Sequence, residues 1–116
     1  IHTNILSAIL GLFIMTSPAL AGNSKYKTVE FHVDGVCNMC KERIENAAYI
    51  KGVKHCEWNK DTEMLTVVYD PDKTDPDTVH KSIAAAGHDT EEMKADPEAY
   101  SKLPACCAYR EGVHKH

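Results

Sequence analysis

The sequence predicts an α+β fold in which an open antiparallel sheet carries two helices on one face. Short stretches of alternating apolar and polar residues indicate strands, and two longer stretches have the apolar spacing of helices. Gly, Pro and Asp residues separate these stretches. Their order is β-α-β-β-α-β, and a chain of 116 residues has room for one small domain.

The first half of the domain is predicted to contain a strand, a cysteine loop and a helix. The strand alternates apolar with polar side chains, and its apolar positions are Val29, Phe31 and Val33. Asp34-Gly35 ends this strand, and the pattern becomes helical from Cys40 onward. The predicted buried face of the helix consists of Ile44, Ala47 and Ala48, and Gly52 is expected to end the helix.

The second half is predicted to begin with a hairpin of strands 53–58 and 64–69, joined by a turn over 59–63. Asp75-Pro76 is expected to open the second helix, with Asp75 as the N-cap. Its predicted buried stripe is Val79, Ile83 and Ala86, and Gly87 should end it. We predict a fourth, edge strand over 88–93, which completes a ferredoxin-like sandwich.

The ends of the chain differ from the domain in composition. Residues 5–15 are apolar but too few to span a bilayer, which takes about 20 residues. Ala19-Leu20-Ala21 follows and has the form of a signal-peptidase site. We therefore predict a signal peptide over 1–21, a linker over 22–26, the domain over 27–94 and an extension over 95–116. The protein is expected to be exported, to the periplasm or another extracytoplasmic space, and not to span the membrane after cleavage.

Charge and cysteine content exclude some classes of function. The net charge is −4 and the lysines are interspersed with acidic residues, so the basic face that nucleic acid requires is missing. Five cysteines are an odd number, and they occur as a Cys-x-x-Cys pair, a single cysteine and an adjacent pair. This spacing is not typical of a disulfide framework.

Cys37 and Cys40 are the strongest candidates for a functional site. They lie where the first strand leads into the first helix, so unpaired N–H groups and the helix dipole should favour their thiolate forms. Thiolates are soft ligands that select copper(I), mercury(II) or zinc(II). Because the usual second ligand pair of a structural zinc site is missing, we predict an open site with few ligands, and copper(I) is favoured.

The stretch from Lys27 to Met93 resembles the heavy-metal-associated domain family, which includes copper chaperones, domains of metal-transporting ATPases and periplasmic mercury-binding proteins. The matching motifs are Gly35-Val36-Cys37-Asn38-Met39-Cys40, Gly52-Val53, Val67-Val68-Tyr69-Asp70-Pro71 and Ala86-Gly87-His88. The resemblance implies a ferredoxin-like fold and a metal ion bound by Cys37 and Cys40. The loop is one residue shorter than is usual in the family, because only Val36 separates Gly35 from Cys37.

Other residues are possible additional ligands, each with a simpler structural alternative. His88 follows the second helix, which in this family comes close to the metal loop, so it is either a third ligand or an ordinary exposed histidine. One possibility is that Cys106 and Cys107, with His114 and His116, form a second metal site or a docking arm. The simpler alternative is that these two cysteines are a pair in the C-terminal tail that becomes oxidised. Cys56 is expected in the core, and Met39 to be exposed rather than a ligand.

Three functions fit these residues. The first is a monomeric, non-enzymatic carrier that hands a soft ion to a metal-transporting membrane protein or another metal acceptor. The second is a mercury or zinc scavenger for metal resistance. The third is a thiol-disulfide oxidoreductase with Cys37 as nucleophile and Cys40 as the resolving thiol, although no proline stands where a thioredoxin-type enzyme needs one.

Overall fold

The computed structural model describes residues 25–111 of the chain, which hold three strands, three helices and two 3-10 turns. The predicted signal peptide and the candidate ligands His114 and His116 lie outside these residues. In chain order the elements are β1 (Lys27–His32), α2 (Asn38–Ala48), β2 (Val53–Trp58), β3 (Met64–Tyr69), α3 (Pro76–Ala85), α4 (Pro97–Ser101) and turns at Ala105–Cys107 and Tyr109–Glu111. Within the described part of the chain, no helix is long and apolar enough to cross a membrane.

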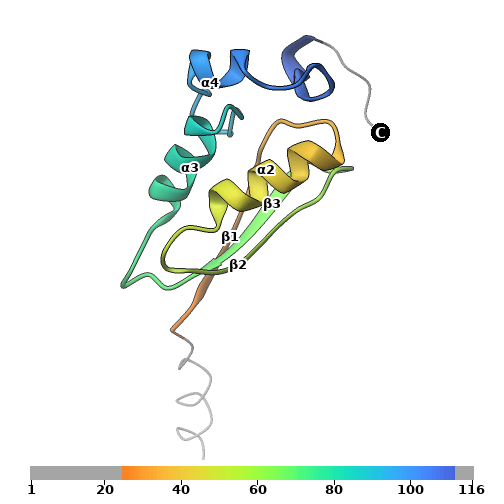
Figure 1. The fold of residues 1–116 in the computed structure, drawn as a ribbon. Coiled ribbons are helices and arrows are strands. Elements are labelled where there is room, and N and C mark those ends of the chain that lie inside the picture. The colour runs from red at the N-terminus through yellow and green to blue at the C-terminus, as the bar shows by residue number, and fades with distance from the viewer. Residues whose placement is uncertain (1–24, 112–116) are drawn as a thin grey trace, which may run out of the picture.

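The three strands form an antiparallel sheet in the order β1-β3-β2, and helices cover one face of it (Figure 1). Leu65 of β3 pairs with Phe31 of β1 and with Trp58 of β2, and all three side chains are buried. Ile44 of α2 and Ile83 of α3 join the same core, so both helices pack on this face. The α+β class, the hairpin and the bounds of its two strands are therefore confirmed.

The predicted fourth strand is wrong as a strand, because residues 88–93 make one isolated bridge to the β1 side, between Val33 and Thr90. The Thr90 side chain accepts hydrogen bonds from the N–H groups of Glu92 and Met93 at 3.2 and 3.0 Å. The Thr90 N–H in turn donates to the Met93 carbonyl at 2.8 Å. These local bonds turn the chain immediately, so the segment touches the edge of the sheet without extending along it.

α3 begins as predicted, whereas α2 begins at Asn38, two residues before the predicted start at Cys40, and also ends earlier. Asp75 caps α3 by accepting a hydrogen bond from the Thr78 N–H at 2.8 Å, and Pro76 occupies the first turn. The last residue of α2 is Ala48, and a tight turn separates it from Gly52, which has a φ of +97°. Gly52 thus serves the turn before β2 rather than the helix end.

Gly35 allows the loop between β1 and α2 to pass directly over the buried Trp58 ring. A Cβ at this position would lie 3.0 Å from Cζ2 of Trp58 and 3.1 Å from Cβ of Cys40. The ring has little freedom to move, because its N–H donates to the Val33 carbonyl at 3.0 Å. The start of α2 is consequently held close to the core.

We expect Gly35→Ala to lower the free energy of unfolding by about 1–3 kcal/mol, because the added methyl group overpacks this contact. Urea unfolding of the reduced protein measures the change. Lys51→Ala, at an exposed position in the turn before β2, is the control and should leave the midpoint nearly unchanged. A Gly35→Ala protein that unfolds at the wild-type urea concentration would contradict this account of the loop.

Candidate metal centre

Cys37 and Cys40 stand at the start of α2, as predicted. Cys37 is the N-cap residue, and Cys40 lies in the first turn on the face that packs into the core. Their sulfur atoms are 3.6 Å apart. The prediction of an open site is wrong for the described structure, because Cys37 is 3% exposed and Cys40 is fully buried. Part of the C-terminal extension covers them.

The environment of Cys37 favours its thiolate. Burial alone would raise the pKa of this thiol, but the backbone of Cys40 and Met39 at the start of α2 and the thiols of Cys107 and Cys40 outweigh burial. Together they lower the pKa to about 7. Since only the thiolate binds soft metals or attacks disulfides, Cys37 is a reactive sulfur close to neutral pH.

Cys106 and Cys107 are brought to the same place by the extension. The Cys107 sulfur lies 3.3 Å from that of Cys37, and the Cys107 side chain is fully buried. Cys106 is partly exposed, and its sulfur lies 4.0 Å from Cys107 and 3.6 Å from the thioether of Met39. Cys37, Cys106 and Cys107 thus form one group of possible metal ligands, with Cys40 beside it.

The extension is held against the domain by specific polar contacts just after Cys107. The Tyr109 hydroxyl donates to the Gly87 carbonyl and accepts from the Asp89 N–H, both at 2.8 Å. The Arg110 guanidinium donates twice to the Asp89 carboxylate, at 2.6 and 3.0 Å. Figure 1 shows the resulting path, in which the blue extension crosses above the loop between β1 and α2.

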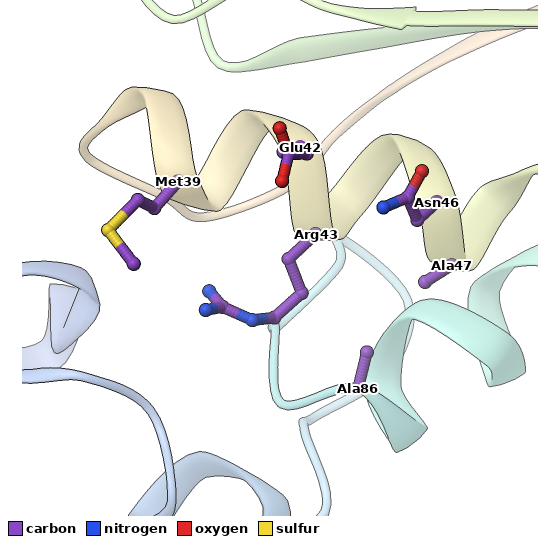
Figure 2. Close-up of a pocket in the computed structure, with 6 residues that line it drawn as sticks. All are labelled: Met39, Glu42, Arg43, Asn46, Ala47 and Ala86. Atoms are coloured by element: carbon purple, nitrogen blue, oxygen red, sulfur yellow. The ribbon is translucent and has the colours of Figure 1, made fainter.

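Arg43 supplies positive charge beside the sulfur group. It projects from α2 into a groove of about 490 Å³ (Figure 2), lined by Met39, Glu42, Arg43, Asn46, Ala47 and Ala86. Burial raises the pKa of Cys107 to about 11, a hydrogen bond from Arg43 opposes this rise, and the thiols of Cys40 and Cys37 add to it. The Cys107 thiol therefore faces Arg43 as well as both cysteines of the loop.

His88 is fully buried, in contrast to the exposed histidine of the simpler alternative. Its Nδ1 lies 2.7 Å from the Asp34 carbonyl, and its Nε2 lies 3.5 Å from the Arg43 guanidinium. The ring also stacks on Tyr109, with centroids 5.3 Å apart. Burial is the main reason that its pKa is lowered to about 4, and Arg43 adds to that effect. His88 therefore contacts Asp34, Arg43 and Tyr109. Among the described residues, the group of possible metal ligands formed by Cys37, Cys106 and Cys107 does not include it.

Cys56 and Met39 lie where the sequence suggested. Cys56 is partly buried against the core, with its sulfur 3.3 Å from the Glu45 carbonyl. Burial and the charge of Glu45 raise the pKa of Cys56 to about 11, so this thiol stays protonated. Met39 is 51% exposed and points toward the extension (Figure 2).

The sequence does not point to Arg43 or to the residues that hold the extension in place, Asp89, Tyr109 and Arg110. Each of them is a common polar surface type, and no spacing pattern connects them. The Asp89–Arg110 ion pair joins residues 21 positions apart. Only the folded chain brings these residues to the metal loop.

Comparisons with known proteins agree with this architecture. The sequence profile of the heavy-metal-associated domain matches residues 30–89. A structure titled CopZ metallochaperone is 27% identical, has a TM-score of 0.53 and aligns over 55% of this chain and 98% of its own. Oxidised MerP from Ralstonia metallidurans CH34 is 26% identical, with a TM-score of 0.54 and coverage of 57% of this chain and 94% of its own.

A third similar structure is the water-soluble region of the P-type ATPase CopA from Bacillus subtilis. It is 30% identical, has a TM-score of 0.54 and aligns over 58% of this chain and 46% of its own. No curated protein matches the sequence. The three alignments cover between 55% and 58% of this chain.

Proposed function

Because this chain belongs to the heavy-metal-associated domain family, we propose that it is a carrier that binds one soft heavy-metal ion through Cys37 and Cys40. The observation that carries the proposal is the pair of sulfurs 3.6 Å apart at the start of α2. There the helix N-terminus favours thiolates, which are the ligands of soft metals. The carrier is expected to pass its ion to a metal-transporting membrane protein or another metal acceptor by stepwise ligand exchange.

Copper(I) is the favoured cargo. It is soft and is satisfied by two or three thiolates, whereas a structural zinc(II) site takes four ligands. Copper is supported by a similar structure, the N-terminal domain of a potential copper-translocating P-type ATPase from Bacillus subtilis in the Cu(I)-loaded state. Mercury(II) is the main alternative, because the family includes periplasmic mercury-binding proteins. Zinc(II) requires the partly exposed Cys106 to join the other three cysteines, which makes it the weakest of the three candidates.

A carrier fits the site better than a thiol-disulfide oxidoreductase. Enzymes of the thioredoxin type place a cis-proline opposite the Cys-x-x-Cys motif. Among residues 25–111 every peptide bond is trans. The match to the heavy-metal-associated domain over residues 30–89 also supports metal transfer.

Export remains our proposal for the location of the protein. It is supported by the apolar run over 5–15 and by the Ala19-Leu20-Ala21 sequence that follows. We further propose that the carrier acts as a monomer outside the cytoplasm. Metal occupancy or a reductant must then keep Cys37 and Cys40 reduced in an oxidising compartment.

Anaerobic titration of the reduced protein with copper(I), against a competing chelator, tests the function. Wild type should take up one ion tightly, and Cys37→Ser/Cys40→Ser should lose that uptake. Cys56→Ser, which removes a thiol outside the sulfur group, is the matched control and should bind like wild type. Parallel titrations with mercury(II) and zinc(II) rank the three ions. Equal uptake by wild type and the double variant would end the metal hypothesis at this loop.

A further inference from the structure

We propose that Cys107 is a third thiolate ligand of the ion that Cys37 and Cys40 bind, so that the C-terminal extension completes the metal site within the same chain. The inference rests on the proposed function and adds to it the coordination number and the role of the extension. Its starting point is the position of the Cys107 sulfur, 3.3 Å from that of Cys37. A short turn at Ala105–Cys107 carries this sulfur to the start of α2.

The sulfur spacing fits three ligands better than two. With metal–sulfur bonds of about 2.3 Å, as for zinc-bound thiolates, two sulfurs on opposite sides of an ion are about 4.6 Å apart and three around it are about 4.0 Å apart. Cys37 lies 3.6 Å from Cys40 and 3.3 Å from Cys107. A three-coordinate ion therefore requires the Cys40 and Cys107 sulfurs each to move away from the Cys37 sulfur by roughly half an ångström, whereas a linear two-coordinate ion requires Cys37 and Cys40 to separate by about 1 Å.

The charge around the sulfurs also suits a third thiolate. Three thiolates and one copper(I) ion carry a net charge of −2, which a buried site tolerates only with compensating groups. Arg43 opposes the rise in the pKa of Cys107 and faces His88 Nε2 at 3.5 Å, so one positive charge lies close to this sulfur. Backbone N–H groups of Met39 and Cys40 already serve the Cys37 sulfur. One full positive charge and one helix N-terminus therefore lie beside the sulfurs.

The extension is fastened so that Cys107, and not Cys106, faces the loop. Tyr109 bridges Gly87 and Asp89 through its hydroxyl, two residues after Cys107. Cys107 is fully buried, whereas Cys106 is partly exposed and contacts the thioether of Met39. Cys106 and Met39 are therefore the sulfurs at the rim, where a metal donor or acceptor would first make contact.

X-ray absorption of the copper(I)-loaded, reduced 116-residue chain tests the inference by counting sulfur ligands. We expect three sulfurs for wild type and two for Cys107→Ser, with the affinity of the variant about ten- to hundredfold lower in chelator competition. Cys106→Ser is the matched control and should keep three sulfurs and wild-type affinity. In the loaded wild type, mass spectrometry after alkylation should show Cys37, Cys40 and Cys107 protected and Cys106 modified.

A second variant keeps every thiol and tests the placement of the extension. Tyr109→Phe removes the hydroxyl that bridges Gly87 and Asp89, so it should lower copper affinity in the same direction as Cys107→Ser and speed alkylation of Cys107. Two sulfurs in wild type, with unchanged affinity in Cys107→Ser, would overturn the inference while leaving the proposed function intact. Equal losses in Cys106→Ser and Cys107→Ser would overturn the assignment to Cys107. Absence of uptake by wild type would overturn both proposals.

Discussion

Treatment of the reduced protein with one equivalent of diamide is expected to abolish metal uptake, and excess reductant is expected to restore it. The Cys37 sulfur lies 3.6 Å from Cys40 and 3.3 Å from Cys107, so a disulfide with either neighbour consumes Cys37. In each case two thiols lose two electrons and two protons, which diamide accepts. One disulfide therefore removes the sulfur that both close pairs share, and the ion loses at least two ligands.

Titration of the oxidised protein with copper(I) measures the loss, and peptide mass spectrometry without reduction identifies the disulfide. We expect a mixture of Cys37–Cys40 and Cys37–Cys107 bonds, and only the first of these in Cys107→Ser. Cys56→Ser should behave like wild type, because the pKa of the Cys56 thiol is raised to about 11 by burial and by the charge of Glu45. Full copper uptake after oxidation, or a single bond between Cys106 and Cys107, would contradict the central position of Cys37.

The strands and helices could be predicted because local patterns determine them. Alternation along β2 and β3, the N-cap at Asp75 and the turn between the two strands all act over a few residues, and all four are found. The prediction of a fourth strand was wrong because local hydrogen bonds, rather than the side-chain pattern, determine the path of this segment. The Thr90 hydroxyl forms local hydrogen bonds with the next residues, and alternation of side chains does not reveal this competition.

The metal loop was predictable, but its closure was not. The spacing of Cys37 and Cys40 and their place before a helix indicate a site from the sequence alone. Cys107, in contrast, lies 70 residues after Cys37 in the sequence and comes close to it only in the folded chain. That contact depends on the fastening of Tyr109 and Arg110 to the segment after α3. Without the fold, the adjacent cysteines of the extension were equally consistent with a separate site, and the predicted site was open.

Acidification from pH 7 to pH 5 is expected to lower the free energy of unfolding by about 2 kcal/mol more in wild type than in His88→Asn. Burial holds the pKa of His88 near 4 in the folded protein, against about 6.5 in the unfolded chain. The unfolded chain therefore binds a proton first as the pH falls, so stability is fully present above about pH 6.5 and is lost progressively toward pH 4. Urea unfolding in reductant at several pH values measures the difference.

The contacts of His88 explain why the folded protein resists protonation. Its Nδ1 donates to the Asp34 carbonyl, which leaves Nε2 unprotonated and facing the Arg43 guanidinium. A second proton would place two positive charges together in a buried position beside Tyr109. Asp89 is the nearby carboxylate, and Arg110 keeps its pKa low despite burial, so it stays ionised over this range.

The control for this prediction is His55→Asn, on the exposed side of β2, which should keep the wild-type dependence on pH. The slope of stability against pH is the decisive quantity, since it remains interpretable if His88→Asn is less stable at every pH. A His88→Asn slope equal to that of wild type would mean that His88 takes up a proton in the folded protein as readily as in the unfolded chain. Arg43 would then face a cation rather than an acceptor, and its position between His88 and the Cys107 sulfur would need another explanation.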